Sequence, residues 1–404
     1  MNTENDDKDD DDGADELFEA AAPTEFIDGE ARPPVTAQGT ALCLSGGGYR
    51  AALFHLGAVW ALKRAGCLGE LDRISSASGG SILAALLGLN WQQIEAEGAR
   101  DGQVFMTRIV EPVLKLTSKT VDIGAGLCRL AGLHSLFDPF VHELDQLYSK
   151  RTLQDLPDRP RFVINATNVQ SGALWRFMKP RMRDWRVGDI PEPTVRLSHA
   201  VAASAAYPPF LSPFILKTAP EDFVENSGQD LRGAKFRTRV MLTDAGVLDN
   251  LAVDTAWKKY DTLLISDAGW PLPAQHSPSM RWLGHTQRVV GILTHQLADI
   301  RQTQIKASFK IQRESEREGM THPLGRKGAY WGITSRVESY TKAPFWVEDP
   351  VMLEKVKRLP TRLAAVPRLS KEYLIDWGYM LSRVALEKYF GRACPQPPPF
   401  CRIG

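Results

Sequence analysis

The sequence predicts an α/β fold, in which a mostly parallel sheet lies between layers of helices. A short apolar strand at 41–44 is followed by a glycine-rich turn and a helical pattern. A second apolar strand at 71–76 is followed in the same way by a small-residue turn and another helical pattern. Strands that alternate with helices in this order are typical of layered α/β folds.

The remaining elements are predicted from the spacing of apolar residues and from the positions of glycine and proline. Apolar residues at helical spacing between 49 and 65 predict a helix that ends near Gly66. Further helices are expected at 81–89, 198–207 and 281–317, and further strands at 161–166, 174–178, 239–243 and 262–266. Residues 90–160 are expected to be mostly helical.

The chain is expected to have three regions, the first of which is set apart by its charge. Residues 1–36 carry thirteen acidic and two basic residues, and we expect them to form a disordered acidic tail. Residues 37–268 are expected to form the core, and residues 269–404 an extension that is mainly helical. The chain beyond the tail is net basic, which could favour anionic lipid surfaces or nucleic acid, but scattered solubilising charge explains it equally well. We expect no nucleic-acid partner.

Cysteine usage and hydropathy predict a cytoplasmic protein. The five cysteines are widely spaced and none forms a CxxC pair, although Cys394 and Cys401 flank a proline run and could form a disulfide. The acidic N-terminus does not resemble a secretory signal, and no stretch approaches the roughly 20 apolar residues of a membrane span. Any membrane contact is therefore expected to be peripheral.

Ser78 is the candidate nucleophile. It lies in the small-residue run 76–80 (SASGG), between an apolar strand and an apolar helix. A nucleophilic serine needs such a sharp strand-to-helix turn to expose its oxygen, and the N-terminus of the following helix favours developing negative charge. A tight turn with no catalytic role would have the same sequence pattern, so this alternative stays open.

Gly46, Gly47 and Gly48 form a candidate oxyanion loop. Acyl transfer passes through a tetrahedral oxyanion that backbone N–H groups can stabilise, and consecutive glycines let the chain turn those groups towards the site. Arg50, which follows, could bind a lipid phosphate. A nucleotide-phosphate loop is the alternative, but no Gly-Lys-Ser/Thr follows, and the dinucleotide pattern lacks its last glycine at Ala51.

Asp244 is the candidate base. It ends the apolar strand 239–243 and is followed by two small residues. A carboxylate at the end of a strand, in a crevice, is well placed to accept a proton. A helix-capping role is the alternative, and Asp249 and Asn250 are better placed for it.

These elements together resemble the patatin-like phospholipases over residues 40–267. The resemblance rests on the segments LSGGGYRAALFHLGAVWAL, SSASGGSI, INATNVQSGALWRF, SHAVAASAAYPPFLSP and LTDAGVLDN, in the order that the family uses. It implies acyl-ester hydrolysis by a Ser–Asp dyad without histidine. Ser78 would be the nucleophile, Asp244 the base and residues 46–48 the oxyanion loop, while residues 200–209 would line the acyl site.

Three glycines of the family pattern are replaced by other small residues in this chain. They are Ala51 at the end of the first motif, Ser76 at the start of the second, and Ala245 in the middle of the third. None of these changes removes a reactive group. Each could strain its turn if the position requires a positive φ.

Histidine chemistry is a weaker alternative. His276, His285 and His295 follow Asp244, so the order Ser–Asp–His of an α/β-hydrolase triad is available. His285 and His295, however, fall in the predicted basic helix, and His55 is expected to be packed or to face solvent rather than to be catalytic. No histidine pair has metal-ligand spacing, so we expect no catalytic metal and no cofactor.

The sequence therefore predicts a lipid acyl hydrolase of the phospholipase A type, acting on phospholipid or another acyl-ester lipid. Two alternatives remain open: a soluble carboxylesterase or acyltransferase with the same dyad, and a regulated lipase that is inactive until a ligand or partner binds. The basic stretch 301–317 could dock on anionic headgroups, but its interspersed glutamates favour a solvated helix face.

Overall fold

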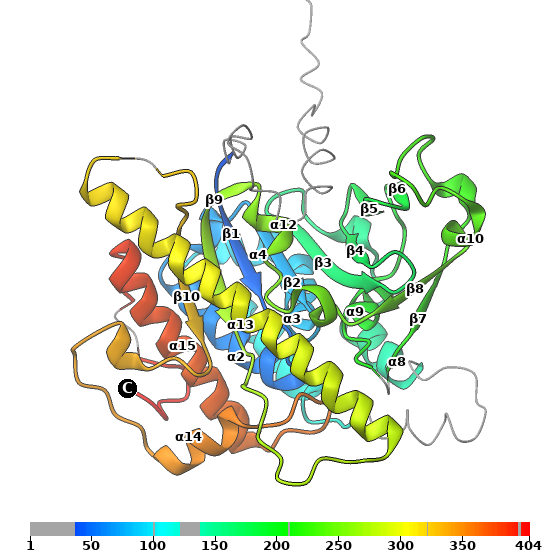
Figure 1. The fold of residues 1–404 in the computed structure, drawn as a ribbon. Coiled ribbons are helices and arrows are strands. Elements are labelled where there is room, and N and C mark those ends of the chain that lie inside the picture. The colour runs from blue at the N-terminus through cyan, green and yellow to red at the C-terminus, as the bar shows by residue number, and fades with distance from the viewer. Residues whose placement is uncertain (1–36, 100–101, 122–137, 209–210, 321, 395–396) are drawn as a thin grey trace, which may run out of the picture.

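The computed structural model describes residues 37–99, 102–121, 138–208, 211–320, 322–394 and 397–404. The predicted acidic tail at 1–36 lies outside the described residues. The predicted layered fold is confirmed: one sheet of ten strands is covered by helices (Figure 1).

Five parallel strands form the centre of the sheet, in the order β10-β9-β1-β2-β3. Antiparallel strands flank them: β4, β5 and β6 continue the sheet from β3, and β8 pairs with the end of β3 and with β7. The strands are β1 Ala37–Leu44, β2 Arg73–Ala77, β3 Arg161–Asn168, β4 Ala173–Phe177, β5 Arg181–Asp184, β6 Gly188–Pro191, β7 Phe214–Lys217, β8 Arg239–Thr243, β9 Tyr260–Asp267 and β10 Lys327–Gly332.

The helices fill the connections and cover both faces. The α-helices are α2 Gly48–Arg64, α3 Gly79–Leu89, α4 Trp91–Glu97, α5 Gln103–Phe105, α6 Glu111–Leu116, α8 Asp138–Leu147, α9 Leu197–Ser204, α10 Ala234–Arg237, α11 Gly246–Asp249, α12 Asp254–Trp257, α13 Trp282–Arg317, α14 Pro350–Lys357 and α15 Arg368–Phe390. Short turns of other helix types are η2 Leu68–Glu70, η3 Met106–Val110, η4 Leu153–Asp155, η5 Pro220–Asp222 and η6 Val337–Ser339.

Alternate residues of the central strands face two separate cores. On β1, Leu42 and Leu44 join the larger core with α2, α3 and α15, whereas Ala41 and Cys43 join a smaller one with α13. Successive side chains of a strand point to opposite faces, so a strand that is apolar throughout is expected to be covered on both sides. The long helix α13 crosses the front of the molecule in Figure 1, and its Ile305 packs into the smaller core.

The C-terminal region is tied closely to the core. It contains the expected helices, and it also contributes β10, which extends the sheet beside β9. Helix α15 crosses α2 where each helix has a glycine, Gly57 in α2 and Gly378 in α15. A Cβ on Gly57 would lie 1.8 Å from the Ile375 backbone oxygen, and a Cβ on Gly378 would lie 1.9 Å from the Phe54 backbone oxygen. Only glycine allows helices to approach this closely, so α15 supports the helix that follows the glycine loop.

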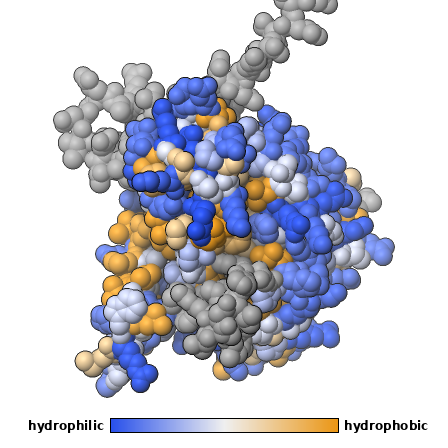
Figure 2. All heavy atoms as spheres, turned by 90° about the vertical axis from the view of Figure 1, so that its right-hand side faces the viewer, coloured by the Kyte–Doolittle hydropathy of each residue, from blue (hydrophilic) through white to orange (hydrophobic). Residues whose placement is uncertain are grey.

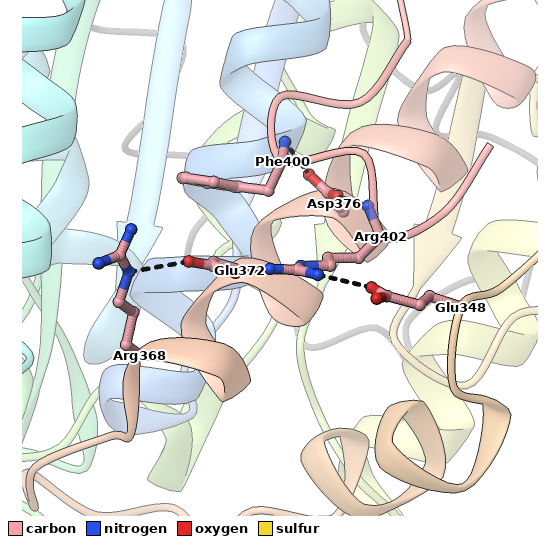
Figure 3. A network of polar contacts seen from close by, with 6 residues as sticks. All are labelled: Glu348, Arg368, Glu372, Asp376, Phe400 and Arg402. Atoms are coloured by element: carbon pink, nitrogen blue, oxygen red, sulfur yellow. Dashed lines mark hydrogen bonds and ion pairs between the residues drawn. The ribbon is translucent and has the colours of Figure 1, made fainter.

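The end of the chain folds back on α15 (Figure 3). The Asp376 carboxylate accepts the backbone N–H groups of Phe400 and Arg402, at 3.0 and 2.7 Å. The Arg402 guanidinium lies between Glu372 and Glu348, at 2.8 and 2.7 Å. Burial raises the pKa of Asp376 to about 6, and the two N–H groups oppose that rise. Cys394 and Cys401, which could have formed a disulfide, are both free.

Candidate active site

The glycine loop connects β1 to α2 and takes a conformation that requires glycine. Gly47 and Gly48 have φ of 143° and 61°, which side chains of L-residues rarely adopt. A Cβ on Gly48 would lie 2.5 Å from the backbone oxygen of Arg362. The loop is therefore shaped both by its own glycines and by the C-terminal segment that packs against it.

The amides of the loop are not equally available, and the prediction is wrong for Gly46. Its N–H donates to the Asn250 oxygen at 2.9 Å, so this amide holds the loop in place and cannot receive an oxyanion. Among the hydrogen bonds of the described residues, none engages the N–H groups of Gly47 or Gly48. Both lie at the N-terminus of α2, where unpaired N–H groups favour negative charge.

Ser78 occupies the turn between β2 and α3. Its φ of 47° and ψ of −117° are strained for a residue with a side chain. The strained turn lifts the side chain away from both the strand and the helix, the arrangement of a nucleophile elbow. Ser78 remains 5% exposed, and its backbone N–H donates to the Ser204 hydroxyl at 2.8 Å.

The Ser78 turn and the glycine loop are in direct contact. A Cβ on Gly79 would lie 2.1 Å from the Gly48 oxygen, and one on Gly46 would lie 3.1 Å from the Ser78 Cβ. Parallel pairing of β1 with β2 explains this, because Leu44 pairs with Ser76 and both chains leave the sheet at the same edge. The serine oxygen and the free loop amides therefore belong to one site.

The three small residues that replace family glycines are not strained. Ser76 lies within β2, Ala51 lies within α2, and Ala245 has an αR conformation with φ of −57°. In the serine turn, the positive φ falls on Ser78 itself. The expectation that these substitutions could strain their turns is therefore wrong.

Asp244 is brought to the same edge by an antiparallel strand. Thr243 at the end of β8 pairs with Thr167 of β3, and the Thr167 hydroxyl donates to the Asp244 oxygen at 2.9 Å. β3 extends beyond the end of β2, and β8 returns along it, so the chain after Thr243 arrives level with Ser78. Sequence order alone does not reveal this return.

The Asp244 carboxylate is buried and lines the same cleft as Ser78, near enough for the Ser78 side chain to lower its pKa. It also accepts the Gly246 N–H at 2.7 Å. Burial raises the pKa of Asp244 to about 6, and the Ser78 side chain and the Gly246 N–H group oppose that rise. A carboxylate with a raised pKa is a stronger base than an ordinary aspartate, so the pair has the geometry and the electrostatics for proton transfer from serine to aspartate.

Ser204, which the sequence analysis did not single out, joins the two candidate catalytic segments. Its hydroxyl accepts the Ser78 N–H and contacts the Ser81 hydroxyl at 2.9 Å, and its carbonyl accepts the Ala245 N–H at 3.1 Å. Ser204 thus fixes the distance between the serine turn and the segment that carries Asp244. A serine among small helical residues gives no sequence signal for this role.

A cleft of about 170 Å³ opens above Ser78 and Asp244. The loop after α9 contributes Tyr207 and Pro208, from the segment expected to line the acyl site. One wall comes from α13, beyond the segments that the family resemblance covers. The α13 residues that line it are Val290, Thr294, His295, Ala298, Asp299 and Gln302.

Arg50 lines the cleft but is held by the protein itself. Its guanidinium donates to the Ala268 oxygen at 3.2 Å, to the Leu359 oxygen, and to the Thr361 hydroxyl at 3.3 Å. Burial lowers the pKa of Arg50 to about 10, which the nearby Asp267 carboxylate opposes. These bonds fix the C-terminal segment beside the glycine loop, and contact with a substrate phosphate remains a prediction.

No hydrogen bond in the described part of the chain joins a histidine to Ser78 or Asp244. His295 reaches the cleft, but its ring nitrogens face the Gly291 and Trp270 oxygens, at 2.7 and 3.1 Å. His276 and His285 are exposed. His55 is buried, the first of its two expected placements, and desolvation lowers its pKa to about 4.

Two further features are absent from the described residues. Acidic, histidine and cysteine side chains form no group of three or more that could hold a metal ion. No described helix combines the length and the apolar character needed to cross a membrane.

Comparisons with known proteins identify a family for most of the core. Residues 42–257 match the family model described as patatin-like phospholipase. No curated protein sequence matches the chain.

Solved structures with a similar fold include human GIVD cytosolic phospholipase A2, at 11% identity and a TM-score of 0.46. The match covers 88% of this chain and 59% of the human one, so this chain spans less than two thirds of that protein. VipD from Legionella pneumophila matches at 14% identity and a TM-score of 0.36, over 87% of this chain and 67% of that one.

Proposed function

Since this chain belongs to the patatin-like phospholipase family, we propose that it hydrolyses fatty acyl esters of phospholipids through a dyad of Ser78 and Asp244. The observation that carries the proposal is that Ser78, in its strained turn, shares a cleft with the buried Asp244 carboxylate, whose pKa is raised. The pair lies at the base of this cleft, beside two unengaged backbone N–H groups.

The reaction follows from these positions. Asp244 takes the proton of the Ser78 hydroxyl while the serine oxygen attacks the ester carbonyl. The N–H groups of Gly47 and Gly48 stabilise the oxyanion, and each such donor contributes about 3 kcal/mol in acyl-transfer enzymes. The proton then passes from Asp244 to the departing lysolipid oxygen. Water, deprotonated by Asp244, attacks the acyl carbon, and the proton passes from Asp244 to the Ser78 oxygen as the fatty acid leaves.

The pH dependence of the reaction tests the role of Asp244. The base must be ionised, so we expect kcat/KM to fall as pH drops through about 6, the raised pKa of Asp244. An ordinary aspartate would keep the rate constant down to about pH 4. The measurement is the pH–rate profile on a soluble p-nitrophenyl ester, with protein unfolding followed by circular dichroism at each pH. A rate that is flat from pH 8 to pH 4.5 would contradict the assignment.

Helix α13 supports a peripheral contact with the lipid surface. While one face of it lines the cleft, large apolar side chains on the other face point to solvent at positions 282, 289, 293 and 300. This spacing of seven, four and seven residues keeps them on one stripe of the helix. Trp282 is 80% exposed, and Met280 just before the helix is 97% exposed.

The side of the molecule in Figure 2 is otherwise mainly hydrophilic, with apolar atoms gathered towards its lower left. An apolar stripe beside a lipase cleft would place the cleft at the bilayer surface.

Removing that stripe should separate membrane binding from chemistry. We expect the variant Trp282→Ser with Leu293→Ser to lose about tenfold or more in binding to phosphatidylcholine vesicles, because two buried apolar side chains are worth several kcal/mol. Hydrolysis of a soluble ester should stay within about twofold. Val169→Ser, at an apolar side chain that is 54% exposed after β3, is the matched control. Equal vesicle binding by wild type, the double variant and Val169→Ser would refute the membrane contact through α13.

The regulated-lipase alternative also has an observation in its favour. The cleft of about 170 Å³ is smaller than the roughly 300–1,000 Å³ of typical small-molecule sites, and α13 forms one of its walls. A lipid chain would therefore require α13 to move outward. If this alternative holds, the pure protein will hydrolyse soluble esters but not vesicle lipid until a ligand or partner is added.

A further inference from the structure

A second cavity lies beside the cleft, at the other end of α13. Its volume is about 370 Å³, within the range of roughly 300–1,000 Å³ that is typical of ligand sites. It is enclosed by the C-terminal half of α13, by β10 and η6 with the loop between them, and by the end of α15. Thr334 lines both this cavity and the cleft.

The cavity is cationic without compensating acids. Lys306, Arg313 and Arg336 line it, and no aspartate or glutamate does. Within the described ranges, none of the three forms an ion pair with a carboxylate, whereas Arg301, on the same helix, is paired with Asp254. Three cations without an ion-pair partner around one cavity create a positive potential that attracts anions.

Two of these cations are held in place by aromatic rings. The Lys306 Nζ lies 4.4 Å from the centroid of the Tyr330 ring, and the Arg313 Cζ lies 5.0 Å from that of Tyr389. Cation–π contacts orient a charged group without neutralising it, so both side chains keep their N–H donors for a ligand. Burial lowers the pKa of Lys306, an effect that the nearby acids Asp267 and Asp299 oppose.

Hydroxyl groups add neutral donors to the cations. The side chains of Thr334 and Ser339 line the cavity, and their hydroxyls take part in no hydrogen bond recorded for the described residues. Guanidinium, ammonium and hydroxyl groups around one space are the donors that bind phosphate oxygens in proteins. The set lacks the carboxylates that a cationic ligand or a metal ion would need.

We infer that this cavity is a binding site for a phosphate group, separate from the cleft that contains Ser78. A free phosphate or phosphomonoester and the headgroup of phosphatidic acid share the chemistry that the site recognises. The inference does not depend on the hydrolase activity, because it rests on the donors of the cavity alone.

Two matched triple variants of the full chain test the site. In the cavity variant, Lys306→Gln, Arg313→Gln and Arg336→Gln remove the three cations. In the control variant, Lys217→Gln, Lys235→Gln and Lys310→Gln remove three exposed lysines that do not line the cavity. Both variants have the same net charge. A difference in ligand binding between them is therefore due to where the cations lie and not to the total charge. Circular dichroism and thermal melting without ligand check that both fold.

Calorimetric titration with inorganic phosphate at low ionic strength gives the first measurement. Flotation with phosphatidylcholine vesicles, with and without phosphatidic acid, gives the second. We expect at least one of these probes to bind wild type and the control variant alike, and the cavity variant at least about tenfold more weakly. Binding of inorganic phosphate indicates a soluble ligand, and binding of phosphatidic acid vesicles alone indicates a lipid headgroup. If neither probe distinguishes the cavity variant from the control, the site is refuted.

Discussion

Fatty-acid release from phosphatidylcholine vesicles should fall by about 10³- to 10⁶-fold when Ser78 is replaced by alanine, because the nucleophile acts as a unit with its base and the oxyanion donors. The fold should be retained. The turn is held by the Ser78 backbone N–H, which alanine keeps, and alanine has no bulk that serine lacks. The measurement is the lipid product profile by mass spectrometry, for wild type and Ser78→Ala side by side.

Ser277→Ala is the matched control for this experiment, since Ser277 is exposed. It should release fatty acid at the rate of wild type. A Ser78→Ala protein that melts normally and still produces lysolipid at the parent rate would show that another group is the nucleophile.

Asp244→Asn should lower activity and raise stability at the same time. The loss of the base should cost about 10³-fold or more in kcat. The folded-state pKa of Asp244 is raised above its ordinary value of 3.8 to about 6, so at neutral pH the ionised, buried carboxylate weakens folding. Asparagine cannot ionise, and we expect it to raise the free energy of unfolding at pH 7 by about 1–3 kcal/mol.

The pH dependence of this gain in the free energy of unfolding shows whether its direction is as expected. Stability due to the raised pKa is present at low pH, where the carboxyl group of the wild type is protonated, and is lost as pH rises through about 6. The advantage of Asp244→Asn should therefore grow between about pH 4 and pH 6 and vanish below pH 4. Urea unfolding across this range measures it.

His295→Gln distinguishes the dyad from a triad. His295 lines the cleft but both its ring nitrogens face backbone oxygens, so its replacement should lower kcat by less than about tenfold. A loss on the order of 10⁴-fold would instead support a triad in which histidine is the base. An Asp244→Asn variant with near-normal kcat would lead to the same conclusion.

Local patterns predicted the elements that carry the site because each is encoded within a few residues. The strand–glycine–helix pattern around residues 46–48 and the strand–serine–helix pattern around Ser78 both correspond to continuous pieces of the structure. Strands β3, β4, β8 and β9 were also expected, within a few residues of their ends. The short strands β5, β6, β7 and β10 were not, because four to six residues with charges, proline or glycine carry no clear alternation.

Features that depend on distant segments could not be predicted in this way. The Gly46 amide donates to Asn250, about two hundred residues away. The residues around Gly46 therefore give no indication that this amide is already engaged. Ser204 joins the serine turn to Asp244 only because α9 packs between them. The α13 wall of the cleft and the cationic cavity behind it likewise arise from packing of the C-terminal region on the core.

Peptide mapping after reaction with a fluorophosphonate lipid analogue tests the central claim most directly. The reagent phosphonylates an activated serine oxygen, and mass spectrometry locates the adduct. The proposed dyad predicts one adduct on Ser78 in wild type, a strongly slowed adduct in Asp244→Asn, and none in Ser78→Ala. An adduct on a different serine, or equal labelling of Ser78 in wild type and Asp244→Asn, would contradict it.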